Sequence, residues 1–301
     1  MKIIVPIKQV PETSNVRMDH KTGTIVRESN RSVVNPLDLY SIEAALRLKE
    51  KHGGSISVVS MGPAKAEVAV REAIAMGCDH GTLVSDRAFA GSDTWATSYI
   101  LAQAIRRLGD YDLIICGERA TDGDTGQVGP GIASWLGVPC ATYASSVNVM
   151  RDGALGASAP SAPASAAAKP GRSRARGAAE VPQTEPASLT VERLLEDGYE
   201  TLEVQLPALV TVVKEIARPR LPTMAGKKRA SVVEVQQMTA GDLELEPTYV
   251  GLKGSPTRVV RIRTPKVARD GVKVDAREST AGVADGLVDF LKGKQLLGGV
   301  E

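Results

Sequence analysis

Aromatic residues make up only 3% of this chain of 301 residues. Proteins that bind single-stranded nucleic acid use aromatic side chains as stacking surfaces, so we expect no nucleic-acid partner. The net charge of +2 is too small to predict another polyanionic partner.

Long apolar runs are absent as well, and no stretch approaches the roughly 20 residues that span a membrane. The apolar start, Met1 to Val10, is short and lacks a signal-peptide cleavage pattern. The three cysteines, Cys78, Cys116 and Cys140, lack the spacing of a metal site and predict buried free thiols in a reducing compartment. We therefore expect a cytoplasmic protein with no membrane insertion and no metal site.

No catalytic constellation stands out. The histidines His20, His52 and His80 are scattered beside turns, which is typical of exposed side chains without a special role. No Ser/His/Asp or Cys/His arrangement can be proposed, so we predict no catalytic residues. Redox chemistry carried by a cofactor stays possible, because it needs no such residues.

The first half of the chain alternates short apolar runs with amphipathic segments. The continuous apolarity of Lys2 to Ile7 is typical of a strand that is covered on both faces. Further strands are predicted at Ser55 to Ser60, Gly81 to Ser85 and Tyr111 to Cys116, and helices from Asn35-Pro36 to Gly53, Ala64 to Met76 and Thr94 to Leu108. This alternation predicts an α/β fold with a doubly wound, mostly parallel sheet.

The first predicted helix has a clear apolar stripe, so we expect its polar positions Glu43, Arg47, Lys49 and Glu50 to face water. Between the first strand and this helix lies a polar stretch, Met18 to Ser32, with a possible hairpin turn at Lys21 to Gly23.

The stretch from Tyr111 to Pro130, YDLIICGERATDGDTGQVGP, joins an apolar run to a glycine-rich loop, and helical spacing resumes at Ile132. Free N–H groups at such a helix start favour phosphate, and Gly123, Gly126 and Gly129 let the backbone approach a ligand closely. The loop matches neither the dinucleotide fingerprint nor the P-loop, so it predicts a nucleotide without specifying which one. Because ligands bind at the carboxyl ends of parallel strands, we expect Pro6, Met61 and the loop from Gly117 at one edge.

The composition changes after residues 1–150, which we assign to the first part of the α/β core. Residues 151–188 are rich in Ala, Pro, Gly and Ser and predict a disordered insertion, whose run Arg172 to Arg176 we interpret as a solvated basic linker. Residues 189–216 predict an antiparallel hairpin and the last core strand. Residues 217–230 read as an exposed Pro- and Lys-rich loop, and residues 231–301 as a C-terminal segment with a strand at Val259 to Arg263 and a helix near Ala281 to Lys292.

Five ordered blocks of this chain resemble the beta subunit of electron-transferring flavoproteins. They are MKIIVPIKQVPE at the start, VNPLDLYSIEAALRLKE (Val34 to Glu50), VVSMGPAKAEVAVREAIAMGCDHG (Val58 to Gly81), DGDTGQVGP (Asp122 to Pro130) and LPALVTVVKEIARPRLP (Leu206 to Pro222). The resemblance implies a Rossmann-like α/β domain that pairs with an alpha subunit carrying the electron-transferring FAD. The insertion at 151–188 is a departure that the resemblance does not explain.

The resemblance also implies a second nucleotide in the beta subunit. This is a structural AMP in housekeeping members and a second FAD in electron-bifurcating members, where it takes a hydride from NADH and sends two electrons along different routes. DGDTGQVGP resembles the bifurcating branch, and Gly123 and Gly129 give room for a diphosphate, so we favour FAD over AMP. The chain would then be an electron carrier, with an NADH-oxidising site only in the bifurcating case. A stand-alone nucleotide-sensing module is the third alternative.

The residues that the resemblance assigns to the nucleotide pocket come from the ends of two predicted strands, the start of the first helix and the glycine-rich loop. They are Pro6, Asn35, Pro36, Leu37, Asp38, Met61, Asp122, Gly123, Asp124, Thr125, Gly126, Gln127, Val128, Gly129, Pro130, Gly131, Ile132 and Ala133. Asn35 either contacts the ligand or only caps its own helix. Asp122 and Asp124 suit a helix cap or ribose hydroxyls better than phosphate.

The segment Arg218 to Arg229 resembles the family's partner-recognition loop, in which an apolar anchor flanked by basic residues docks onto acyl-CoA dehydrogenases. Leu221 or Met224 would be that anchor, unless the segment is only a solvated basic linker. The implied partners are the alpha subunit, on which residues 231–301 would lie, an acyl-CoA dehydrogenase-type flavoenzyme and, in the bifurcating case, NADH and ferredoxin.

Overall fold

The computed structural model describes residues 1–12, 16–18, 25–27, 32–151, 186–257, 277, 279–294 and 296. The chain forms two units, Met1–Arg258 and Val259–Glu301. The second unit contains helix α7 (Thr280–Gly293), as predicted. The strand predicted at Val259 to Arg263 and almost all of the predicted insertion lie outside the described residues. No described helix has the length and apolarity needed to cross a membrane.

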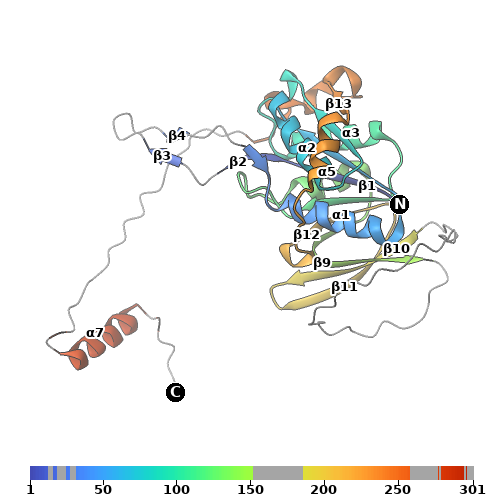
Figure 1. The fold of residues 1–301 in the computed structure, drawn as a ribbon. Helices are drawn as coiled ribbons and strands as arrows, with labels where there is room; N and C mark the ends of the chain where they lie inside the picture. The colour runs from blue at the N-terminus through green and yellow to red at the C-terminus, as the bar shows by residue number, and fades with distance from the viewer. Residues whose placement is uncertain are drawn as a thin grey trace. The chain divides into compact units, whose positions relative to one another are not determined.

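A sheet of 9 strands runs through the first unit in the order β11-β10-β9-β12-β8-β1-β6-β7-β13 (Figure 1). Its strands are β1 (Lys2–Ile7), β6 (Ser55–Met61), β7 (His80–Val84), β8 (Leu113–Gly117), β9 (Cys140–Arg151), β10 (Pro186–Leu195), β11 (Gly198–Gln205), β12 (Ala208–Val212) and β13 (Val235–Met238). From β9 to β13 neighbouring strands are parallel, whereas β10 pairs antiparallel with both β9 and β11. The predicted doubly wound, mostly parallel sheet with an antiparallel hairpin is confirmed.

Helices cover both faces of this sheet. They are α1 (Asp38–His52), α2 (Glu67–Met76), α3 (Thr94–Leu108), α4 (Val128–Leu136), α5 (Met224–Val232) and the short α6 (Gly251–Gly254). Short 3-10 turns are η2 (Ala64–Ala66), η3 (Arg87–Phe89), η4 (Lys214–Ile216), η5 (Ala240–Asp242) and η6 (Pro247–Tyr249).

Alternate residues of the central strands enter different hydrophobic clusters. Ile3 and Val5 of β1 lie in a cluster with side chains of α1 and α2, whereas Ile4 lies in a cluster with α3 and α4. Strands that are apolar at every position therefore fill a core on each face, as their continuous apolarity predicted.

Some elements escaped the sequence analysis or differ from it. Strand β9 was not predicted, β13 extends the core sheet beside β7, and α5, which begins at Met224, occupies half of residues 217–230, which were expected to be an exposed loop. Two small antiparallel pairs also form: β2 (Gln9–Pro11) with β5 (Ser32–Val34), which was not predicted, and β3 (Val16–Met18) with β4 (Ile25–Arg27), on either side of the expected hairpin turn. The turn expected at Lys21 to Gly23 lies outside the described residues.

Two expectations about single residues were wrong. Glu43 does not face water, since the residue is only 3% exposed, and it is paired with arginines instead. Cys140 is exposed, whereas Cys78 and Cys116 are buried free thiols as expected.

Candidate functional site

A cavity of about 440 Å³ lies at the carboxyl ends of β1, β6 and β8, between the starts of α3 and α4. Pro6, Met61 and the loop after Gly117 all line it, so the predicted gathering of these segments at one edge is confirmed. Its other lining residues are Ile7, Lys8, Asp38, Phe89, Gly91, Ser92, Asp93, Thr94, Thr97, Leu101, Cys116, Glu118, Arg119, Ala120, Gly123, Thr125, Gly126, Gln127, Val128 and Gly129.

Helix α4 begins at the cavity with no side-chain cap. Gln127 is its N-cap residue, and no side-chain hydrogen bond closes the first turn. The helix starts at Val128, four residues before Ile132, where the sequence first shows helical spacing of apolar residues. Pro130 lies in the first turn, where its missing N–H removes no hydrogen bond within the helix. Backbone N–H groups of this turn are therefore left for a ligand.

The glycines of this loop are there for different reasons. Gly126 has a φ of 64°, a left-handed conformation that side chains disfavour. A Cβ at Gly129 would lie 2.7 Å from Thr211 Cγ2, so glycine allows α4 to sit against β12, and that space is not free for a ligand. At Gly123 a Cβ would meet nothing within 4 Å.

The loop's carboxylates are held by cations rather than by the helix. Asp122 Oδ1 accepts a bond from Lys8 Nζ at 2.6 Å, and Arg119 Nε lies 3.1 Å from Asp124 Oδ1 and 3.0 Å from Glu118 Oε1. Neither Asp122 nor Asp124 caps α4, so of the two roles that the sequence suggested for them, contact with ribose hydroxyls stays a prediction. These ion pairs fasten the loop across the cavity edge.

The start of α3 is the second helix end at the cavity, and the sequence analysis missed it. Asp93 caps this helix, since its Oδ1 accepts bonds from the backbone N–H groups of Trp95 and Ala96 at 3.0 Å. Its Oδ2 accepts two bonds from Thr257 at 2.8 and 2.9 Å. An aspartate immediately before the predicted helix was a recognisable capping signal.

The start of α1 contributes a buried carboxylate. Asp38 lines the cavity, and its oxygens accept bonds from the Lys8 backbone N–H at 2.7 Å and from Asn35 Nδ2 at 2.9 Å. Burial raises the pKa of Asp38 to about 7, although these two hydrogen bonds oppose the shift. Near neutral pH this carboxyl therefore carries only part of a negative charge.

Asn35 is completely buried and does not line the cavity. Its Nδ2 donates to Asp38 and to the Arg119 carbonyl oxygen, and its Oδ1 accepts from the Thr121 backbone N–H. Asn35 therefore holds the glycine-rich loop against the start of α1, and the α1 N-cap is Leu37 instead. This supporting role was neither of the two alternatives that the sequence offered.

Eight other predicted pocket residues lie near the cavity without lining it. They are Pro36, Leu37, Asp122, Asp124, Pro130, Gly131, Ile132 and Ala133, of which Ile132 and Ala133 are buried in the core. A direct contact between these residues and a ligand stays a prediction.

Besides charged side chains such as Lys8 and Arg119, the walls of the cavity present three kinds of group. Met61, Phe89 and Leu101 are apolar, Ser92, Thr94 and Thr97 carry hydroxyls, and the start of α4 offers backbone N–H groups. Cys116 also lines the cavity, but burial raises its thiol pKa well above the ordinary value, so it stays protonated. Such walls suit a ligand with an apolar ring, hydroxyls and a phosphate.

The two residues named as a partner anchor lie on another surface. Leu221 is 87% exposed, and Met224, the first residue of α5, is 80% exposed. Arg218, Lys227 and Lys228 around them are also exposed. Such large apolar side chains ringed by cations are typical of a contact surface.

Comparisons with known proteins match this architecture. Residues 22–162 match the family model described as electron transfer flavoprotein domain. The beta subunit of the electron transfer flavoprotein of Thermoanaerobacterium thermosaccharolyticum is 44% identical over 272 residues, which cover 90% of this chain and 91% of that protein.

Two further relatives extend over nearly the whole chain. The caffeyl-CoA reductase-Etf complex subunit CarD of Acetobacterium woodii is 38% identical, over 99% of this chain and 100% of the relative. The acryloyl-CoA reductase electron transfer subunit gamma of Anaerotignum propionicum is 36% identical over the same shares.

Proposed function

Because the chain belongs to the electron transfer flavoprotein family as a beta subunit, we propose that its cavity holds an adenine nucleotide within a complex with an alpha subunit. Electron transfer and the binding of a flavin or nucleotide are general properties of this family. The observation that carries the proposal is the cavity at the carboxyl ends of the strands, with the uncapped start of α4 at its edge.

The phosphate groups would lie at residues Thr125 to Gly129. The α4 start offers unpaired backbone N–H groups and the positive end of the helix dipole, both of which attract an anion. The α3 start is less suitable, because the Asp93 carboxylate already accepts bonds from two of its N–H groups and would repel phosphate.

The remaining walls would hold the rest of the nucleotide. Hydroxyls of Ser92, Thr94 and Thr97 can exchange hydrogen bonds with the ribose, and Met61, Phe89 and Leu101 can contact the ring system. Asp38 places a partly protonated carboxyl beside the cavity, which can donate as well as accept a hydrogen bond.

We propose that the nucleotide is FAD rather than AMP, and that the chain belongs to the electron-bifurcating branch of the family. The sequence DGDTGQVGP supports this choice, as does the open space at Gly123, where a longer ligand can pass the backbone. A bound FAD would supply both hydride and single-electron chemistry. The electron donor would be NADH, and one acceptor would be ferredoxin.

An acyl-CoA dehydrogenase-type flavoenzyme would be the second acceptor. CarD and the acryloyl-CoA reductase subunit are named as parts of CoA-ester reductase systems, which supports a partner of this class. The exposed Leu221 and Met224 would contact it, with Arg218, Lys227 and Lys228 facing acidic groups. The segment 231–301 would contribute to the alpha-subunit contact, with the exposed Leu287, Val288 and Phe290 of α7 as its apolar residues.

The nucleotide content of the complex tests this proposal. The chain is co-expressed with its alpha subunit, loaded with excess FAD and denatured, and the released nucleotides are identified by chromatography and mass. Two FAD per heterodimer is the expected result. One FAD and one AMP would contradict the bifurcating assignment, and one FAD with no second nucleotide would contradict the nucleotide site itself.

A further inference from the structure

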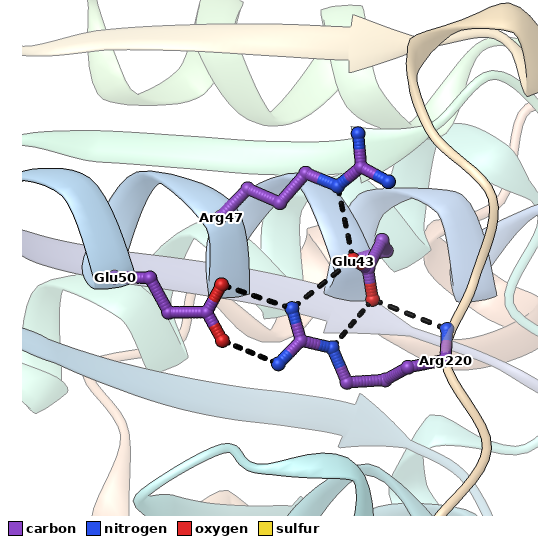
Figure 2. A network of polar contacts seen from close by, with 4 residues as sticks. All are labelled: Glu43, Arg47, Glu50 and Arg220. Atoms are coloured by element: carbon purple, nitrogen blue, oxygen red, sulfur yellow. Dashed lines mark hydrogen bonds and ion pairs between the residues drawn. The ribbon is translucent and has the colours of Figure 1, made fainter. Parts of the chain in front are cut away.

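The segment between η4 and α5, residues 217–223, belongs to no helix or strand. Its middle residue, Arg220, nevertheless binds to α1. Figure 2 shows the attachment: the guanidinium of Arg220 lies between the carboxylates of Glu43 and Glu50, which are about two turns apart on α1. The exposed Leu221 follows directly, so the anchored residue and the proposed docking residue are neighbours.

The guanidinium of Arg220 donates four hydrogen bonds in this contact. Its Nε and backbone N–H donate to Glu43 Oε2 at 2.8 and 3.2 Å, and its Nη2 donates to Glu43 Oε1 at 3.1 Å. The two terminal nitrogens also donate to both oxygens of Glu50. A planar guanidinium that meets two carboxylates in this way has little rotational freedom.

Glu43 holds Arg220 strongly because the Glu43 side chain is buried. Its side chain is 4% exposed, whereas that of Glu50 is 59% exposed. Burial by itself would raise the pKa of Glu43, but the hydrogen bonds from Arg220 and Arg47 outweigh it, so its pKa lies below the ordinary value. Leaving a buried carboxylate without its partner destabilises the folded state, so the folded chain strongly favours the paired arrangement.

The other end of the segment is fixed on α2. A Cβ at Gly226 would lie 2.1 Å from the Ala75 carbonyl oxygen, so α5 touches the α2 backbone directly. Arg71 Nη1 donates to the Ala230 carbonyl oxygen at 2.6 Å, and Arg229 Nη2 donates to the Ile74 and Cys78 carbonyl oxygens at 2.6 Å. Leu221 and Met224 therefore lie between two fixed points.

Prolines stiffen the stretch further. Pro219 and Pro222 have fixed φ angles, and each restricts the residue before it to extended conformations. A short, restricted segment that is held at both ends gives its exposed side chains a defined position.

We propose that Arg220, held by Glu43 and Glu50, is a positioning residue that pre-orders the Leu221–Met224 docking surface for the flavoenzyme partner. The inference rests on the docking role proposed above. Ordering an anchor before binding lowers the entropic cost of association, so the benefit shows as affinity for the partner.

Arg220→Gln and Arg47→Gln form a matched pair for the test. Each removes one guanidinium that binds Glu43, but only Arg220 belongs to the docking segment. Electron exchange between the heterodimer and a purified butyryl-CoA dehydrogenase is measured at rising dehydrogenase concentration. We expect Arg220→Gln to raise KM about tenfold with a much smaller change in kcat. Arg47→Gln should leave KM within about twofold.

Hydrogen exchange and a third variant complete the design. Arg220→Gln should speed amide exchange in residues 217–223, and its nucleotide content should match that of the unmodified heterodimer. Equal KM values for the two arginine variants would overturn the positioning role. If Arg220→Gln does not fold, Glu50→Gln takes its place, because it weakens the exposed ion pair of Arg220 while the buried pair with Glu43 stays intact. The KM of Glu50→Gln must then exceed that of Arg47→Gln.

The docking role is tested separately by the double variant Leu221→Ala and Met224→Ala. A raised KM here, together with equal values in the arginine pair, would overturn only the positioning role of Arg220. An unchanged KM in the double variant would overturn the docking surface itself.

Discussion

The starts of helices α3 and α4 meet at the same cavity, yet they treat their first backbone N–H groups differently. At α3 the Asp93 carboxylate accepts bonds from two of these groups, whereas at α4 no side chain does so. A capped start gains stability, and an uncapped start keeps its donors for a ligand. The difference supports the proposal that α4 binds the anion, whereas α3 supports the site.

The start of α1 resembles that of α4 in having no side-chain cap, but its first residue, Asp38, carries a buried carboxylate that is only partly charged near neutral pH. Burial raises the pKa of Asp38 to about 7, well above the value of about 4 expected in the unfolded chain. As the pH rises from about 4 to about 7, the unfolded chain loses this proton while the folded chain keeps it. Asp38 therefore makes the free energy of unfolding fall over this range, by at most about 1.4 kcal/mol for each pH unit.

The first prediction has the largest expected effect. Asp38→Asn should flatten the fall in unfolding free energy between pH 5 and 7, as measured by denaturant titration at several pH values. Asp112→Asn is the control, since Asp112 accepts a bond from the Lys2 backbone N–H at the start of β1, as Asp38 does from the Lys8 N–H just after the end of that strand. An unchanged pH profile in Asp38→Asn would show that this carboxyl is ionised in the fold.

The second prediction concerns the packing of the first turn of α4 against β12 of the sheet. Gly129→Ala would place a Cβ 2.7 Å from Thr211 Cγ2 and push the first turn away from β12. Overpacking of this kind costs about 1–3 kcal/mol, so we expect the affinity for AMP or FAD to fall at least fivefold in calorimetric titrations. Gly241→Ala is the control, since Gly241 does not line the cavity and its Cβ would lie 3.8 Å from the nearest atom, so this variant should bind normally. Equal losses in both variants would contradict this account.

The third prediction removes the cap of α3. Asp93→Ala should lower the free energy of unfolding by about 0.5–2 kcal/mol, the usual cost of a lost cap. Asp93→Asn keeps an acceptor for the N–H groups and should recover most of that loss. Nucleotide affinity should change less than stability in both variants. A loss of affinity without a loss of stability would mean that Asp93 belongs to the ligand site.

The fourth prediction gives α4 the cap that it lacks. Gln127→Asp would supply an acceptor and a negative charge at the helix start, which stabilises a helix by about 0.3–1 kcal/mol. The same charge would repel phosphate, so thermal stability should rise while nucleotide affinity falls. Gln127→Asn is the uncharged control. Unchanged nucleotide affinity in Gln127→Asp would place the phosphate elsewhere.

Much of this arrangement was readable from the sequence because it depends on local patterns. Continuous apolar runs predicted the buried parallel strands, and α3 spans the predicted residues Thr94–Leu108. The edge where Pro6, Met61 and the loop after Gly117 meet followed from the topology of a doubly wound sheet.

Contacts between distant parts of the chain could not be predicted in this way. Helix α5 has no apolar stripe and is held by backbone contacts and by arginines that bind carbonyl oxygens. Glu43 looks like a surface residue until Arg220, 177 positions later, is placed beside it. The burial of Asn35 could not be read from its neighbours in sequence, because it depends on the loop at Arg119 to Thr121, which binds its side chain.

Amide hydrogen exchange of the heterodimer, stripped of nucleotide and then reloaded with FAD, tests the central claim most directly. We expect FAD to protect residues 125–129 at the start of α4 more strongly than residues 94–97 at the start of α3. Protection at α3 with none at α4 would contradict the assignment of the phosphate site to the uncapped helix.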